Sequence, residues 1–256
     1  MAHKDPKHTI VVHSIGYTKA DLDAAPPEEK TFYLMAGSVA NDLAMLNKAL
    51  LATVATPDHG HRISSQGIST GLFLILRMLS GRLVEAHKLT SSFSQMIKKR
   101  YLDELSAEAR DSFYDIHKYF SGKRSLLLEV RDSLAAHHLR ENVEQSYASL
   151  DDGHDLGDYL SEHVGNTLYY TAELLHYETL TNLSSLPHSV AIEKWIDDAT
   201  KQSANFGTFL HGFAYVFAQR FLSHKFESIL NEREVIPVAD FRNSSMPFFT
   251  TVPEPR

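Results

Sequence analysis

The chain has 256 residues, no cysteine and a formal net charge of −7 at pH 7. A hydrophobic fraction of 43% and a charged fraction of 22% are ordinary for a globular domain, so the composition excludes a disordered or fibrous chain. The absence of cysteine excludes disulfides, thiolate metal sites and a cysteine nucleophile. The acidic balance excludes a surface that binds nucleic acid over its whole extent, because such binding needs many Lys and Arg side chains.

The amino-terminal segment carries charges and histidines where a signal peptide needs a continuous apolar run. No uninterrupted apolar stretch approaches the roughly twenty residues of a membrane span. We therefore expect a cytoplasmic protein that has no membrane partner.

Residues 1–30 predict an amino-terminal arm, in which the β-branched run from His8 to Tyr17 suits a strand or an extended segment. Beyond it, apolar residues recur at three- and four-residue spacing, which is typical of helices packed in a bundle. In the first helix these positions are Leu34, Met35, Val39, Leu43, Leu46, Leu50 and Leu51. The predicted helices cover residues 32–53, 65–93, 106–120, 125–140, 167–183 and 187–230. The first two should form an antiparallel hairpin, and Ser106 should cap the third.

Residues 145–165 interrupt the helical pattern, because Asp152-Gly153 is a hairpin signal and Gly157 and Gly165 disfavour a helix. We expect a small β-hairpin or irregular insertion there. The prolines of residues 233–256 predict an extended tail. The sequence thus predicts an all-α, up-and-down bundle of five or six helices, with residues 31–232 as a single helical domain.

The segment Leu126–Arg140 gathers the polar groups that are most suited to chemistry, and reads LLLEVRDSLAAHHLR. On a helix, Arg131 and His138 return to nearly the same face. The apolar residues Leu127, Val130 and Leu134 form a stripe at helical spacing, so the polar groups should lie at the edge of a buried seam.

Basic residues cluster near this segment, and Lys123, Arg124 and Arg140 are candidate RNA contacts. A second basic run covers residues 98–100. Both runs are also compatible with an ordinary solvated charged face.

Two patterns suit a metal. Glu173 and His176 supply one Glu-x-x-His motif, whereas a di-iron bundle needs two such motifs and two further glutamates. The pair His154-Asp155 lies in a segment with the composition of a turn, and residues 59–61 suit a solvated loop. We expect neither a metal nor another cofactor, and a metal-binding bundle that uses Glu173 and His176 remains an alternative.

Arg131, Asp132 and His137 form the third pattern, in which five residues separate the arginine from the histidine. Here the chain resembles the HEPN family (higher eukaryotes and prokaryotes nucleotide-binding). Its motif is an arginine, then Asn, Asp or His, then a histidine after four to six residues. The order of helices also resembles a group of HEPN-like bacterial and phage-associated proteins, over about residues 32–222. In that group aromatic residues flank the histidine, whereas this chain has Ala136 and His138 there, so either His137 or His138 could be the functional histidine.

The resemblance implies a metal-independent endoribonuclease that leaves 2′,3′-cyclic phosphate ends, in a toxin–antitoxin or phage-defence role. It also implies a homodimer whose two motifs face one cleft, with an antitoxin or other partner protein as a further expectation. A histidine that titrates near neutral pH can transfer the protons of this reaction, and a guanidinium can stabilise the pentacovalent phosphate. Asp132 would orient one of these groups, and Glu85 and Asn41 could project toward the same seam.

Two other interpretations stay open. The same bundle can be a non-catalytic module that binds a partner protein or a nucleotide. Alternatively, Arg131 with Asp132 or Glu129 forms a structural network that fixes the helix, with the histidines as its partners.

Overall fold

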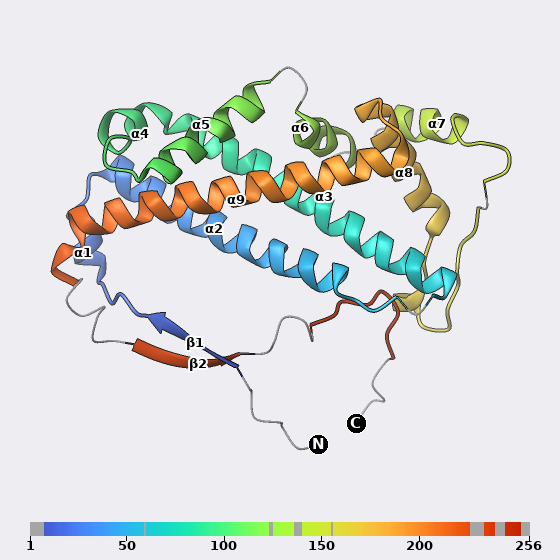
Figure 1. Cartoon of the computed structure of the whole chain (residues 1–256), viewed down its shortest axis with the longest axis horizontal. Helices are drawn as coiled ribbons and strands as arrows, with labels where there is room; N and C mark the ends of the chain where they lie inside the picture. The colour runs from blue at the N-terminus through green and yellow to red at the C-terminus, as the bar shows by residue number, and fades with distance from the viewer. Residues whose placement is uncertain are drawn as a thin grey trace. The chain divides into compact units, whose positions relative to one another are not determined.

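The computed structural model describes residues 8–58, 60–122, 125–135, 140–154, 156–225, 233–238 and 244–251. These residues contain nine α-helices and a two-stranded antiparallel sheet (Figure 1). The α-helices are α1 (Lys19–Asp23), α2 (Pro27–Val54), α3 (Arg62–Ser92), α4 (Ser94–Arg100), α5 (Ala107–Ser121), α6 (Leu126–Val130), α7 (Arg140–Ala148), α8 (Tyr170–Ser184) and α9 (His188–Phe221). The strands are β1 (His8–His13) and β2 (Arg233–Val238). The all-α fold predicted from the sequence is confirmed, and the helices that it did not predict, α1, α4 and α7, are short.

The chain forms two compact units, each built from three separate stretches. The first unit contains Met1–Asp42, Ala86–Lys118 and Ala204–Ser244. The second contains Leu43–Glu85, Tyr119–Ser203 and Ser245–Arg256. Helices α2, α3 and α9 each contribute residues to both units.

The core of the first unit is aromatic. Phe32 of α2 is fully buried, and its ring meets that of Phe213 of α9 edge to face at a centroid distance of 4.6 Å. The ring of Tyr101 also packs against that of Phe213, at a centroid distance of 4.3 Å. Helix α5 packs closely on α9, because a Cβ added to Gly212 would lie 2.5 Å from the Cβ of Ala109. The predicted cap of α5 is also present, since Ser106 Oγ accepts from the amide of Ala109 at 3.2 Å.

The sheet of the first unit joins the two ends of the chain. Strand β1 pairs with β2 in an antiparallel register that runs from His8 opposite Val238 to His13 opposite Arg233. The extended run near His8 therefore has a partner, and the carboxyl-terminal tail contributes a strand that the sequence pattern did not predict.

The core of the second unit surrounds Trp195 of α9, which is fully buried. Its indole Nε1 donates to Ser80 Oγ of α3 at 2.8 Å, and the ring of Phe73 meets it edge to face at 5.3 Å. The α2–α3 hairpin is present as expected, with Gly71 of α3 close to the methyl group of Thr53 of α2. Unlike the prediction for α2, Leu34, Met35 and Leu51 are exposed; the buried positions of α2 include Phe32, Ala36, Val39, Leu43 and Leu50.

In the insertion predicted at residues 145–165, residues 145–148 belong to α7, and the described residues that follow are mostly irregular. They contain turns and one isolated bridge, in which Tyr159 and Leu168 exchange backbone hydrogen bonds of 2.8 Å. The side-chain amide of Asn166 makes two hydrogen bonds to the backbone of Thr250, which lies near the carboxyl terminus. Its Nδ2 donates to the carbonyl oxygen of Thr250 at 2.7 Å, and its Oδ1 accepts from the backbone N–H of Thr250 at 3.0 Å. Phe248 and Phe249 pack against Gly67, where a side chain would not fit.

Among the described residues, one helix is long and apolar enough to cross a membrane by length and composition alone. This helix is α3, whose most apolar window has a mean hydropathy of 1.4 and is 44% buried in the structure. Its inward residues, such as Leu76 and Leu79, have no exposed surface, as expected of a core helix in a bundle.

Candidate functional site

The segment that carries Arg131 is not one straight helix. Helix α6 ends at Val130, and residues Arg131–Ala135 form a π-helical turn. Leu127, Val130 and Leu134 are buried as predicted. Single π-helical turns inside helical segments occur often at functional sites. The turn is wider than that of a straight α-helix. His138 lies outside the described residues, so its pairing with Arg131 stays a prediction.

Tyr119 positions the start of this segment within the second unit. Its hydroxyl donates to Asp198 of α9 at 2.9 Å and accepts from the amide of Leu127 at 3.4 Å. Burial raises the pKa of Tyr119, and the nearby charge of Asp198 raises it further, so the phenol stays protonated and keeps both contacts.

Arg131 is held between two carboxylates. Its Nη1 donates to Asp132 Oδ1 at 2.7 Å, and its Nη2 donates to Glu85 Oε1 of α3 at 3.1 Å. The hydrogen bond to Asp132 raises the pKa of Arg131, and the charge of Glu85 adds to this effect. The side chain of Arg131 is 28% exposed, and those of Asp132 and Glu85 are exposed further. The guanidinium is therefore fixed in direction and still reaches solvent.

This arrangement suits anion recognition. A guanidinium has five N–H donors in a planar fork, and the two carboxylates occupy one donor on each terminal nitrogen. The remaining donors can bind a phosphate in two-point geometry. Of the residues predicted for this seam, the structure brings Arg131, Asp132 and Glu85 together.

Of the other six predicted residues, two are described in the structure and four are not. Asn41 is exposed on α2 and belongs to the first unit, whereas Arg131 belongs to the second. Arg140 begins α7, is 89% exposed and pairs with Glu144 at 2.6 Å. The other four, His137, His138, Lys123 and Arg124, lie outside the described residues.

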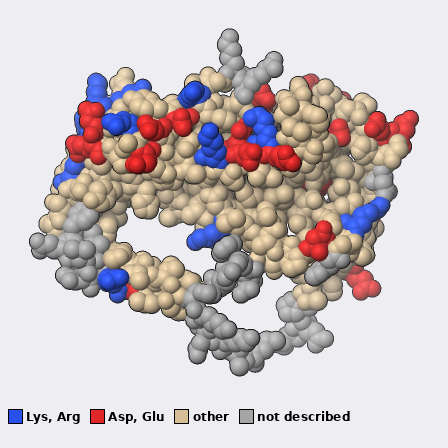
Figure 2. Space-filling model, in the orientation of Figure 1, with Lys and Arg blue, Asp and Glu red and all other residues tan. Residues whose placement is uncertain are grey.

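On the face drawn in Figure 2, basic and acidic side chains of the described residues lie side by side. The chain as a whole has a formal net charge of −7 at pH 7. A nucleic acid that binds here would therefore need local contacts more than a broad basic surface.

Glu173, the candidate metal ligand, is ion-paired. Its Oε1 lies 3.6 Å from Arg77 Nη2 of α3, and both side chains are largely buried. The charge of Glu173 and, above all, burial raise the pKa of the neighbouring Tyr177. Within the described stretches of the chain, no three His, Asp or Glu side chains lie together in a group that could hold a metal ion. The geometry of Glu173 is that of a structural ion pair.

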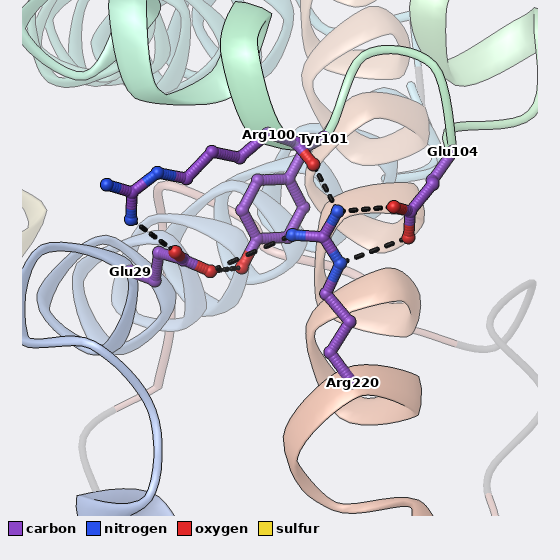
Figure 3. A network of polar contacts seen from close by, with 5 residues as sticks. All are labelled: Glu29, Arg100, Tyr101, Glu104 and Arg220. Atoms are coloured by element: carbon purple, nitrogen blue, oxygen red, sulfur yellow. Dashed lines mark hydrogen bonds and ion pairs between the residues drawn. The ribbon is translucent and has the colours of Figure 1, made fainter.

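A second polar cluster lies in the first unit and was not predicted (Figure 3). The carboxylate of Glu29, on α2, is buried and accepts hydrogen bonds from the Tyr101 hydroxyl and, at 2.5 Å, from Arg100 Nη1. Arg220 of α9 lies with its guanidinium 4.4 Å from the centre of the Tyr101 ring. The same guanidinium donates to both oxygens of Glu104 and to the carbonyl of Arg100.

The groups of this cluster satisfy one another. Burial raises the pKa of Tyr101, and its hydrogen bond to Glu29 acts in the same direction, so the phenol remains a donor. Buried charges are stable only when they are paired and hydrogen-bonded. The cluster therefore ties α2, α4 and α9 together. Glu29 and Arg220 each lie more than seventy residues along the chain from Arg100, Tyr101 and Glu104, so no local pattern could have revealed the cluster.

Two histidines form a third group in the first unit. The rings of His87 of α3 and His117 of α5 lie 5.6 Å apart, and His87 Nε2 shares a hydrogen bond of 3.1 Å with Ser91 Oγ. Burial lowers the pKa of His87 to about 4, and the charge of His117 adds to this. Burial also lowers the pKa of His117. Both rings are therefore neutral at physiological pH.

The chain matches no protein-family model, no curated protein and no solved structure.

Proposed function

We propose that this protein is a metal-independent endoribonuclease of the HEPN type, which leaves 2′,3′-cyclic phosphate ends. The observation that carries the proposal is Arg131, which two carboxylates fix at a π-helical turn while its guanidinium still reaches solvent. The motif R-D-S-L-A-A-H supports it, because it supplies an arginine, an aspartate and a histidine in one segment.

In the proposed reaction, the 2′-oxygen of a ribose attacks the adjacent phosphorus, and the bond from phosphorus to the 5′-oxygen breaks. His137 takes the proton of the 2′-hydroxyl or gives one to the leaving 5′-oxygen, and the partner motif of a homodimer supplies the other transfer. Arg131 stabilises the charge that builds on the phosphate oxygens. Asp132 and Glu85 hold the guanidinium in its productive direction.

The proposed biological role is a toxin or a phage-defence nuclease that acts on RNA in the cytoplasm and that an antitoxin or another partner controls. Lys123, Arg124 and Arg140 would contact the RNA backbone. Because the net charge is acidic, RNA binding should weaken steeply as salt rises.

Cleavage of a mixed RNA in EDTA tests this proposal, with the wild type compared with Arg131→Ala and His137→Ala. We expect cyclic-phosphate ends from the wild type and none from either variant, with unchanged far-UV circular dichroism. The matched control is Lys19→Gln, which alters an exposed ion pair of α1 and should leave cleavage intact. Cleavage that persists in Arg131→Ala would refute the assignment.

One observation favours a second candidate, a non-catalytic binding module. The positive charge of Arg131 is already balanced by Asp132 and Glu85, as in a structural network. In that case the wild type would bind a partner protein or a nucleotide without cutting RNA, at any concentration at which it is folded.

A further inference from the structure

A cavity of about 320 Å³ lies in the second unit, between the turn that joins α2 to α3, the first turns of α3, and residues 245–249. Its apolar lining residues are Pro57, Ile68, Pro247, Phe248 and Phe249. Its hydroxyl-bearing lining residues are Thr56, Ser64 and Ser245. The volume lies within the range of about 300–1,000 Å³ that is usual for small-molecule sites. The cavity can therefore hold a small organic molecule.

Two sets of hydrogen bonds hold the wall of the cavity that lies near the carboxyl terminus. The N–H of Met246 donates to Oγ1 of Thr56 at 2.9 Å. The backbone of Thr250 is held by the side-chain amide of Asn166, through hydrogen bonds of 2.7 and 3.0 Å. Residues 248–249 lie between these two anchors along the chain, so this wall of the cavity is preformed.

The turn between α2 and α3 is held as well. Asp58 Oδ1 accepts from the N–H of Gly60 and from the hydroxyl of Ser65, each at 2.9 Å. These bonds fix the chain between Pro57 and the first turn of α3. A preformed site loses little conformational entropy when a ligand binds, so more of the contact energy appears as affinity.

The two phenylalanines bring aromatic surface to the cavity. The ring centroids of Phe248 and Phe249 lie 5.0 Å apart, and the ring planes meet at 71°. Both side chains pack against Gly67, where an added Cβ would lie 2.8 Å from the ring of Phe249. Rings that are held in this way can make edge-to-face or offset contacts with an aromatic molecule, which add to the energy of burying its surface.

The lining also decides the charge of the ligand. None of the residues that line the cavity carries a charge. A charged ligand would therefore lose its hydration there without gaining a charged partner. Pro57, Ser245 and Pro247 are exposed, so a ligand can enter from solvent beside them.

We propose that this cavity binds a neutral aromatic molecule of about the size of indole. The apolar side chains enclose its rings, and the hydroxyl of Ser64 or Ser245 accepts a hydrogen bond from its N–H or O–H group. The proposal uses no residue of the Arg131 site, so it does not depend on the ribonuclease activity.

Titration of the full chain with indole, followed by ligand-observed NMR, tests the proposal. We expect saturable binding with a Kd of about 1 mM or below. Indole-3-acetate has the same rings and adds a carboxylate, so it should bind at least about 10-fold more weakly. Indole that does not bind at about 1 mM would overturn the proposal, and so would equal affinity for the two compounds.

Two substitutions locate the binding in the cavity. Ser64→Phe adds a ring to its lining, and Phe249→Ala removes one from its wall, so each should weaken indole binding at least about 10-fold. The matched control is Ser38→Phe, at an exposed position of α2 that does not line the cavity, and it should keep the wild-type affinity. Far-UV circular dichroism checks that each variant is folded. Wild-type affinity in either folded cavity variant, or an equal loss in Ser38→Phe, would overturn the assignment.

Discussion

Two glycines of α9 should respond in opposite ways to the same substitution. Gly207 and Gly212 lie five residues apart in one helix of the first unit. A Cβ added at Gly207 would meet no atom within 4 Å. One added at Gly212 would lie 2.5 Å from the Cβ of Ala109 and 3.6 Å from a methyl of Leu105.

The magnitudes follow from these distances. Alanine is better than glycine in a helix interior by about 0.5–1 kcal/mol, so Gly207→Ala should raise the free energy of unfolding by that amount. Gly212→Ala has the same gain in helix propensity. However, two carbon atoms in van der Waals contact prefer a separation of about 3.5–4.0 Å, and the new methyl carbon would lie closer than that to Ala109. Helices α5 and α9 must therefore separate by roughly 1 Å, and overpacking of this kind costs about 1–3 kcal/mol. The free energies of unfolding of the two variants should therefore differ by this overpacking cost.

Urea denaturation followed by far-UV circular dichroism measures both variants. We expect a higher midpoint than the wild type for Gly207→Ala and a midpoint at or below the wild type for Gly212→Ala, with little change in slope. Equal stabilisation by both substitutions would refute the close packing of α5 on α9, because the contact with Ala109 is expected only at Gly212.

Three further predictions concern polar groups that are buried or half-buried. Ser80→Ala leaves the indole N–H of Trp195 without its acceptor, so the free energy of unfolding should fall by about 1–3 kcal/mol in urea denaturation; no change would show that the contact is not made. Glu29→Ala removes the acceptor of Tyr101 and should cost about 2–4 kcal/mol, less than breaking a fully buried pair because one arginine partner reaches solvent. Urea denaturation measures this loss of stability as well. A free energy of unfolding that stays within error of the wild-type value would contradict the buried cluster. The pKa of His87 is lowered to about 4, so between pH 6.5 and 4 the unfolded chain binds a proton that the folded chain does not. Stability should therefore fall as pH decreases through this window, and His87→Asn should flatten that slope. An unchanged slope would argue against a half-buried ring that stays neutral in the folded chain.

The three- and four-residue spacing of apolar residues was enough to predict much of the fold. The buried stripe of Leu127, Val130 and Leu134 and the capping by Ser106 depend on residues within a few positions of one another, so both could be predicted locally. The exposed Leu34 and Met35 show the limit of this reasoning, because spacing identifies a helix without fixing how wide its buried face is.

Features that join distant residues could not be predicted. Strand β1 pairs with a strand more than two hundred residues later, and its own sequence is too short to identify that partner. The π-helical turn at Arg131 has no local signal either, although it decides which side chains share a face. At the candidate site, the contact between Arg131 and Glu85 agrees with the expectation that both face one seam, because helices that pack in a bundle bring their inner edges together.

The most direct test of the ribonuclease proposal separates catalysis from binding at Arg131. We would measure the single-turnover rate constant of RNA cleavage and the RNA dissociation constant for the wild type and Arg131→Lys. Lysine keeps the positive charge and loses the planar fork, so the rate constant should fall by about 100-fold or more, while affinity should change little because the charge that binds phosphate is retained. A wild type that binds RNA without cutting it, or a variant that cuts at the wild-type rate, would contradict the proposal.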